Sequence, residues 1–227
     1  MLIRIPNVLT GDALARCQQI MIESEWVDGA VTAGKQSVKV KNNLQLPEQS
    51  AAATEASKLV LAGLANNALF ITAALPKKIF KPLFNCYTGE HNTFGNHIDN
   101  AIRTHKGEGG NVRTDLSATL FLSEPDSYEG GELVIEDTFG TQRVKLAAGD
   151  MILYPSSSVH RVEPVTKGAR IASFFWIESM IRETERRRLL YEMDMALLDL
   201  RSREGDTEAV VRLTGCYHNL VRMWADS

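Results

Sequence analysis

A histidine and an aspartate stand two residues apart in the stretch GNHIDN, residues 95–100. In a β-strand, side chains at positions i and i+2 point to the same face, so His97 and Asp99 could bind one metal ion together. Two polar residues in a turn between strands would have the same spacing. The stretch therefore needs a third ligand before it indicates a metal site.

His160 is the candidate for that third ligand, because it opens the strand-like run HRVEPV after the turn PSSSV. Two histidines and one carboxylate leave three positions open on a metal ion, as in non-haem Fe(II) oxygenases. A closed structural zinc site would need a fourth ligand, usually a cysteine, and none lies nearby in the sequence. We interpret His91 and His105 as polar residues exposed to solvent, and the glycine at 95 as a turn toward the metal.

Arg170 adds a second group with a chemical use. Residues 165–168, VTKG, have the pattern of a hairpin with Gly168 in the left-handed conformation, which would set Pro164 opposite Arg170. In that register Arg170 shares a face with His160, roughly 13 Å away at ~3.3 Å per residue. A five-carbon dicarboxylate chelating the metal could reach the guanidinium with its far carboxylate. A shift of one residue would turn Arg170 outward, where a surface ion pair is the simpler interpretation.

The elements that must position these residues follow from the apolar pattern. Thr10 is placed to cap a helix that begins GDALARCQQIMIESEW, with Leu14, Cys17 and Met21 on one side. A second helix is predicted from Pro47, as its first residue, through SAAATEASKLVLAGLAN. Both helices precede the candidate metal ligands and would flank the domain that carries them.

Short strand-like runs separated by Gly, Pro, Asp and Ser extend from about residue 70 to 177. DLSATLFLS alternates Leu116, Ala118, Leu120 and Leu122 with Ser117, Thr119 and Phe121. The runs ELVIE, QRVKL, MILYP, HRVEPV and ARIASFFWI follow at close spacing. This rhythm predicts an all-β sandwich or barrel. The basic, glycine-rich segment 102–115 is predicted to be one long irregular loop, with Arg103, Lys106 and Arg113 either covering the site as a lid or solvated.

After residue 179 the pattern becomes helical again. Apolar residues recur there at helical spacing: Leu190, Met193, Leu197 and Leu200. The stretch REGDTE then marks a break before a last helix at roughly 207–225. We predict two units, 1–179 with the strands and N-terminal helices, and 180–227 as a C-terminal helical extension. The apolar stripe is predicted to be packing surface, within the chain or against a second copy.

Composition limits the classes of partner. Lys and Arg number 25 against 28 Asp and Glu, a formal charge of −3, which gives no support for nucleic acid as a partner. No stretch approaches the roughly 18 apolar residues of a membrane span, and the N-terminus lacks the apolar run of a signal peptide. The three widely spaced cysteines, an odd number, indicate buried thiols in a reducing cytoplasm.

Three segments together resemble a known family: NCYTGEHNTFGNHIDN, RTDLSATLFLSEPDSYEGGELVIED and LAAGDMILYPSSSVHRVEPVTKGARIASFFWIES. They are similar to the Fe(II)- and 2-oxoglutarate-dependent dioxygenases of the prolyl 4-hydroxylase superfamily, and most of all to bacterial PKHD-type hydroxylases. The motifs span roughly residues 79–179, and the helical tail also resembles the C-terminal extension of those proteins. The resemblance implies an α+β protein with a double-stranded β-helix, a cupin-like jelly-roll, flanked by helices.

Residue by residue, the resemblance implies His97, Asp99 and His160 as iron ligands and Arg170 as the group that binds the distal carboxylate of 2-oxoglutarate. Tyr87 matches a tyrosine whose hydroxyl helps to hold 2-oxoglutarate; a buried strand tyrosine is the alternative. Phe121 stands where some prolyl hydroxylases carry another co-substrate tyrosine. Gly130 and Gly131 are given a structural role, a tight turn into a strand.

The implied activity is hydroxylation of a substrate C–H bond with Fe(II), 2-oxoglutarate and O2, releasing succinate and CO2; ascorbate is added as a candidate cofactor. The substrate is left open between a polypeptide and a small molecule, such as a siderophore, because the bacterial relatives are linked with iron uptake. Two alternatives remain. One is a non-catalytic sensor of iron and 2-oxoglutarate that signals through its helical tail, and the other is a cupin-like metal enzyme without a co-substrate.

Overall fold

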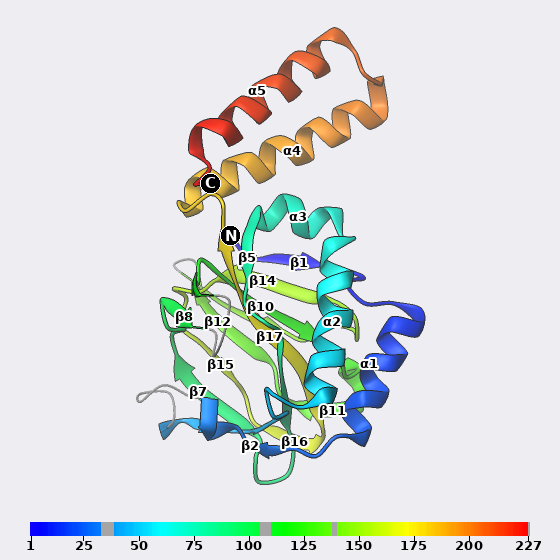
Figure 1. The fold of residues 1–227 in the computed structure, drawn as a ribbon, viewed down its shortest axis with the longest axis vertical. Helices are drawn as coiled ribbons and strands as arrows, with labels where there is room; N and C mark the ends of the chain where they lie inside the picture. The colour runs from blue at the N-terminus through cyan, green and yellow to red at the C-terminus, as the bar shows by residue number, and fades with distance from the viewer. Residues whose placement is uncertain (33–38, 105–109, 138–139, 227) are drawn as a thin grey trace.

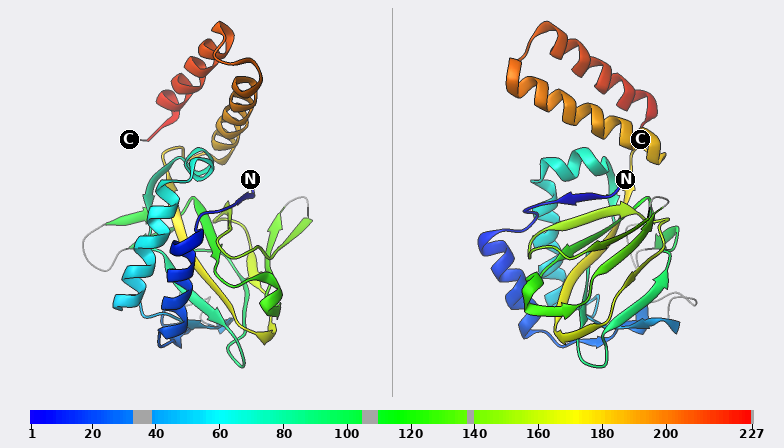
Figure 2. Two further views of the ribbon diagram at one scale, coloured as in Figure 1. Left: turned by 90° about the vertical axis from the view of Figure 1, so that its right-hand side faces the viewer. Right: turned by 180° about the vertical axis from the view of Figure 1, so that it is seen from behind.

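The computed structural model describes residues 1–32, 39–104, 110–137 and 140–226. Two antiparallel sheets face one another, helices α1 and α2 cover the outer face of the larger sheet, and a pair of helices projects from one end (Figures 1 and 2). This is an α+β double-stranded β-helix, as the sequence predicts. Between the sheets lies the space into which the candidate site residues point.

The larger sheet has eight strands in the order β1-β14-β10-β17-β6-β4-β2, with β5 paired to β17. Its strands are β1 (Ile3–Ile5), β14 (Met151–Pro155), β10 (Leu116–Phe121), β17 (Arg170–Ser179), β6 (Leu83–Tyr87), β4 (Leu44–Gln45), β2 (Val27–Asp28) and β5 (Pro76–Ile79). Strand β17 is the longest and pairs with β10 on one side and with β6 and β5 on the other. It therefore ties the middle of the sheet together.

The smaller sheet has five strands in the order β13-β12-β15-β7-β3. They are β13 (Gly140–Val144), β12 (Leu133–Asp137), β15 (His160–Val162), β7 (Thr93–His97) and β3 (Lys41–Asn42). Two further pairs complete the strands: β11 (Tyr128–Gly130) with β16 (Val165–Gly168), and β8 (Ile102–Thr104) with β9 (Asn111–Arg113). The last pair corrects the prediction of one irregular loop at 102–115, of which 105–109 lie outside the described residues.

Strand β10 shows how the alternating pattern builds both the core and the site. Leu116, Ala118 and Leu120 join the apolar cluster beneath the helices, while Ser117 and Thr119 on the opposite face line the cavity between the sheets. All six residues of the strand are buried. The alternation predicted from the sequence is thus present, and both faces of the strand are covered.

Helices α1 (Gly11–Glu23), α2 (Ala51–Ala65) and α3 (Ala68–Ala74) supply the other half of that cluster. Thr10 occupies the N-cap of α1 without a side-chain hydrogen bond. Helix α2 begins later than predicted, because Ser50 caps it by accepting a hydrogen bond from the backbone N–H of Ala53. Helix α3 also replaces the strand-like character expected from about residue 70.

Among the described residues no single helix is long and apolar enough to cross a membrane. Helices α2 and α3 meet the length and composition requirements only as a pair, and they are bent by 84° at the break between them. Both helices contribute buried side chains to the main core, Val60 and Phe70 among them.

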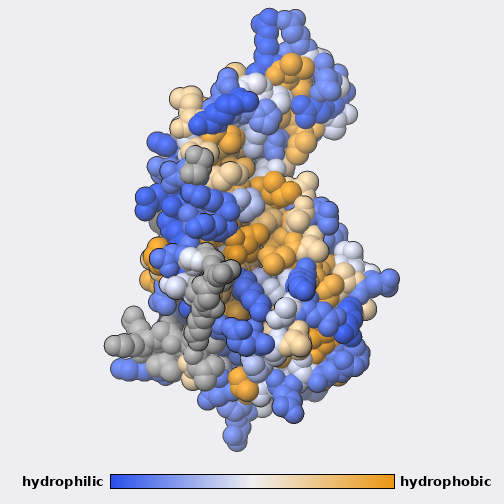
Figure 3. Space-filling model, viewed as in Figure 1, coloured by the Kyte–Doolittle hydropathy of each residue, from blue (hydrophilic) through white to orange (hydrophobic). Residues whose placement is uncertain are grey.

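Helices α4 (Thr184–Glu204) and α5 (Glu208–Trp224) form the helical extension. Leu190 and Leu197 are buried with Tyr217 of α5 and with Leu75 of the jelly-roll, so the predicted apolar stripe is packing surface within the chain. Figure 3 shows apolar residues gathered where the extension meets the region around α3. The break between the helices follows the sequence signals: Gly205 ends α4, and Thr207 caps α5.

Two expectations about small residues need correction. Cys17 and Cys86 are buried as predicted, but Cys216 on α5 is exposed. Gly95 does not turn the chain, because it lies within β7, where a Cβ atom would stand 3.0 Å from the Cβ of Val40. A glycine at this position permits the close approach of Val40 to the strand that carries His97.

Candidate active site

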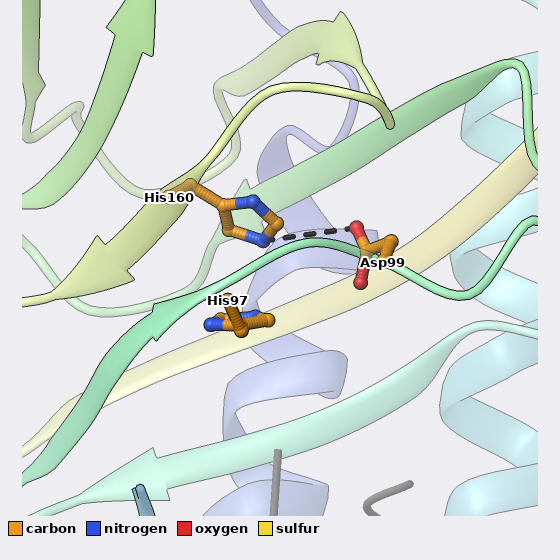
Figure 4. Close-up of side chains that lie close together, drawn as sticks. All are labelled: His97, Asp99 and His160. Atoms are coloured by element: carbon orange, nitrogen blue, oxygen red, sulfur yellow. Dashed lines mark ion pairs between the residues drawn. The ribbon is translucent and has the colours of Figure 1, made fainter. Parts of the chain in front are cut away.

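The three candidate metal ligands lie together at the end of the smaller sheet. His97 is the last residue of β7 and faces His160, the first residue of β15, across the strand pair, while Asp99 follows in the loop beyond β7. One ligand atom from each lies within 4.8 Å of the others. Figure 4 shows the Asp99 carboxylate directed toward the His160 ring, with Nε2 of His160 3.7 Å from Oδ2 of Asp99.

Backbone carbonyls orient both imidazole rings. Nδ1 of His97 lies 2.8 Å from the carbonyl oxygen of Gly95, and Nδ1 of His160 lies 3.0 Å from that of Ser158. A carbonyl can only accept, so each Nδ1 donates to it and each Nε2 is the ring nitrogen left to bind a metal ion. Burial, and then the neighbouring His160, lower the pKa of His97 to about 4, so its ring is neutral and able to bind metal at pH 7.

Two serines hold the carboxylate of Asp99. The hydroxyl of Ser117 donates to Oδ2 of Asp99 over 2.6 Å, and the hydroxyl of Ser156 lies 2.7 Å from that of Ser117. Because Ser117 gives its proton to Asp99, Ser156 donates to Ser117. Neither serine was predicted from the sequence to belong to the site. The one signal for Ser117 is the alternation of β10, which sets it on the face opposite Leu116.

Arg170 is the first residue of β17 and is paired with Tyr87 of β6. Its side chain is 1% exposed, and its guanidinium lies over the rings of Tyr87 and Phe121 at 5.3 and 5.0 Å. None of its three guanidinium nitrogens has a hydrogen-bond partner among the described residues. A buried cation without a partner is costly, so this position fits an anion supplied from outside the chain.

The predicted pairing of the strand that carries Arg170 is wrong. Gly168 does adopt the left-handed conformation, but residues 165–168 pair with β11, and β17 pairs with β6 and β10. Arg170 therefore belongs to the larger sheet and His160 to the smaller one. The two side chains line one cavity between the sheets rather than one face of a single sheet.

Tyr87 is fully enclosed and lines the same cavity. Burial raises its pKa, and the charge of Arg170 opposes that rise, so the phenol is protonated and able to donate at neutral pH. Gly131 explains how Arg170 is accommodated: it has a φ of +70°, and a Cβ atom there would lie 3.1 Å from Cδ of Arg170. His91 pairs with Thr88 in a turn and does not line the cavity, and His105 lies outside the described residues.

These residues fit an Fe(II) ion and a dicarboxylate. Two imidazoles and one carboxylate form a three-ligand set that leaves coordination positions open. The unpaired guanidinium of Arg170 in the same cavity offers a fork-shaped donor to a carboxylate. The three metal-binding side chains and the buried Arg170 thus fit Fe(II) and 2-oxoglutarate, the two components that the sequence resemblance implies.

Comparison with known proteins first defines the class. Residues 82–178 match the family model of the 2OG-Fe(II) oxygenase superfamily, and residues 185–226 match the model of the PKHD-type hydroxylase C-terminal domain. The protein is thus an Fe(II)- and 2-oxoglutarate-dependent oxygenase. Fe(II), 2-oxoglutarate and O2 follow as the requirements of that superfamily.

Full-length relatives narrow the class. The chain is 58% identical to a PKHD-type hydroxylase of Saccharophagus degradans, 60% identical to one of Nitrosomonas eutropha and 55% identical to one of a Polaromonas species. Each comparison covers the whole of both chains. The chain belongs to the PKHD-type hydroxylases, as the sequence motifs indicated.

Solved structures support the fold. A prolyl hydroxylase of Trichoplax adhaerens, in complex with a peptide fragment of hypoxia inducible factor, matches with a TM-score of 0.59 at 16% identity, covering 83% of this chain and 86% of that one. A prolyl-4-hydroxylase of Pseudomonas putida matches with a TM-score of 0.51 at 19% identity, covering 78% and 92%. Identities this low show a shared jelly-roll fold and leave the substrate open.

Proposed function

We propose that this hydroxylase inserts oxygen into a C–H bond of its substrate while converting 2-oxoglutarate to succinate and CO2. His97, Asp99 and His160 hold Fe(II) through two Nε2 atoms and one carboxylate. Arg170 binds the distal carboxylate of 2-oxoglutarate, and Tyr87 donates a hydrogen bond to it. Fe(II) supplies the redox chemistry with O2 when it is bound.

The chain itself orients the metal ligands, neutralises the charge of the co-substrate and excludes water from the site. The carbonyls of Gly95 and Ser158 keep both imidazoles in one tautomer, and Ser117 fixes one oxygen of Asp99. Phe121 and Tyr87 lie on the Arg170 guanidinium, which leaves its hydrogen-bonding edge for a ligand. No side chain has to act as a general acid or base in this scheme.

The observation that carries the proposal is the unpaired, buried Arg170 in the cavity of the His-Asp-His cluster. A metal enzyme of cupin type without a co-substrate would give no reason to bury that charge. The alternative of a non-catalytic sensor also gains no support, since the relatives at 55–60% identity over the full chain are described as hydroxylases.

Succinate release tests the activity. Protein prepared without oxygen, loaded with Fe(II) and 2-oxoglutarate and then exposed to O2, should release succinate slowly even without substrate. His97→Ala and Asp99→Ala should abolish this release. Mass spectrometry measures the amount of succinate released per protein chain. Arg143→Gln, a change at an exposed surface pair, is the control. Absence of succinate under all substrate conditions would refute the proposal.

Further parts of the proposal concern the setting of the enzyme. The chain acts in the cytoplasm on a small molecule or a polypeptide, with a role in iron uptake, and uses ascorbate to sustain activity; nucleic acid and membrane are not partners. Residues 1–179 form the catalytic unit and 180–227 the extension, which mediates self-association. Exposed apolar side chains on α4 and α5 support that last point: Leu189, Leu198, Val211 and Leu213.

A further inference from the structure

A second arginine lines the same cavity as Arg170. Arg103 of β8 lies with its guanidinium 3.8 Å from the ring centroid of Trp176 and 5.9 Å from that of Phe80. Its Nε is buried without a hydrogen-bond partner among the described residues. The guanidinium therefore lies over an indole ring, and its Nε has no acceptor among the described residues.

The other arginine of this strand pair is fully engaged. Arg113 of β9 donates to both carboxylate oxygens of Asp115, at 2.8 and 3.0 Å, and pairs more loosely with Glu178 and Asp226. These contacts fasten the β8–β9 pair to β17 and fix the strand from which Arg103 projects. The sequence does not distinguish the two arginines, whereas in the structure Arg113 anchors the strand pair and Arg103 lines the cavity.

A lysine stands at the same open side of the cavity. Lys41 of β3 lies with its ammonium 5.5 Å from the ring centroid of Phe94 and 5.9 Å from that of Phe174. The cavity thus combines two cations with the faces of aromatic side chains. A ligand that meets this combination has an anionic group joined to a flat apolar portion.

The net charge of the cavity with Fe(II) and 2-oxoglutarate bound also favours an anionic substrate. Among described residues the cavity is lined by three cationic side chains, Lys41, Arg103 and Arg170, and by one carboxylate, Asp99. A divalent iron and a 2-oxoglutarate dianion cancel each other, so loading leaves the excess of positive charge in place. A half-enclosed cavity with such an excess attracts anions and raises their local concentration.

We infer that the substrate carries a carboxylate or phosphate group beside a planar apolar portion, and that Arg103 selects it by binding that group while Phe174 covers the apolar portion. The inference rests on the proposed function for where the reaction occurs. Arg103 is a specificity-determining residue in this scheme, separate from Arg170, which serves the co-substrate.

The test uses simple probes on the intact, loaded protein. Protein with Mn(II) and saturating 2-oxoglutarate, free of O2, is titrated with benzoate, phenyl phosphate or uncharged benzyl alcohol, followed by tryptophan fluorescence and calorimetry. At least one anion should bind about tenfold or more tightly than benzyl alcohol, as expected for a charge-assisted contact. The benzoate and phenyl phosphate arms separate a carboxylate substrate from a phosphate one.

Variants assign the effect to the side chain. Arg103→Gln should weaken binding of the preferred anion about tenfold, Arg103→Lys less, and Arg143→Gln, which removes the same charge from the surface, should leave it unchanged. Equal binding of anion and alcohol, or equal losses in Arg103→Gln and Arg143→Gln, would overturn the inference. Affinity for 2-oxoglutarate is measured in parallel: it should be unaffected by Arg103→Gln, whereas failure of the unmodified protein to bind 2-oxoglutarate would refute the proposed function instead.

Discussion

The protein buries two arginines in two regions, and their surroundings are opposite. Arg187, at the junction of the jelly-roll and the helical extension, is 2% exposed and donates to the carbonyls of Ile181 and Arg182 and to the hydroxyl of Thr184. Arg170, in the cavity, is 1% exposed and has no partner for its guanidinium among the described residues. Burial alone therefore says little about role.

The difference lies in what completes each site. At Arg187 the chain supplies acceptors to both terminal guanidinium nitrogens, so its contacts stabilise the junction in the folded protein. At Arg170 none of the described residues forms a hydrogen bond with the guanidinium, so the charge is compensated when a ligand arrives. One arginine serves stability and the other serves binding, and substitutions should separate the two roles.

The largest effect is expected for Arg170→Met, which keeps the volume and removes the charge. Affinity for 2-oxoglutarate should fall by a factor of a hundred or more, roughly 3 kcal/mol, because a buried carboxylate would lose its paired cation. Metal affinity should stay nearly the same, since Arg170 does not contact the cluster of His97, Asp99 and His160. Calorimetric titration of 2-oxoglutarate and of Mn(II) measures both quantities.

Stability of the ligand-free Arg170→Met variant gives the sharper comparison. Removing an uncompensated buried charge should leave the midpoint of thermal unfolding unchanged or higher. A clear loss of stability would show that Arg170 has a structural role like that of Arg187, and the comparison between the two regions would fail.

Arg187→Met should produce the reverse pattern. The substitution leaves two carbonyls and one hydroxyl without their donor, and we expect a loss of about 2 kcal/mol or more in the free energy of unfolding. Affinity for 2-oxoglutarate should not change. Urea denaturation and the co-substrate titration together check this, with Arg188→Met as a control at an exposed pair on the same helix. An equal loss in both variants would contradict a specific role for Arg187.

The sequence predicted those parts of the fold and site that depend on local pattern. The spacing of His97 and Asp99, the alternation of β10 and the positions of β14 and β17 all followed from short stretches. Asp99 differs from the prediction in one respect: β7 ends at His97, so the Asp99 carboxylate reaches the cluster from a loop and not from the strand. The roles of these ligands, of Arg170 and of Tyr87 stay predictions that the binding experiments test.

The parts that were missed depend on pairing between distant segments. Residues 165–168 bind β11, some 40 residues earlier in the chain, and nothing in the VTKG pattern distinguishes that partner from the adjacent strand. The support of Asp99 by Ser117 and Ser156, and the satisfaction of Arg187 by carbonyls, likewise exist only once the tertiary structure has formed. Buried polar partners are a property of packing, which one-dimensional spacing does not specify.

A smaller effect is expected for Ser117→Ala, which tests how far the cavity depends on its supporting hydrogen bonds. The Asp99 carboxylate would lose its 2.6 Å donor, and Ser156 would lose its acceptor. Metal affinity should fall roughly tenfold, as for other residues that orient a metal ligand. Mn(II) titration measures the loss, and Ser157→Ala, next to Ser156 in the turn after β14 but outside the cavity lining, is the control. No change in Ser117→Ala would mean that the ion alone orients Asp99.

The smallest expected effect is a difference in thiol reactivity between the cavity region and the helical extension. Burial raises the pKa of Cys86, beside the cavity, to about 11 and that of Cys17 to about 12, so both stay protonated and enclosed at pH 8. Cys216, in the helical extension, is exposed. A disulfide reagent such as dithionitrobenzoate should therefore react rapidly with one thiol per folded chain and with all three only in denaturant. Cys216→Ser should remove the rapid phase, and a rapid phase that persists in this variant would show that the core around Cys86 opens more readily than its packing indicates.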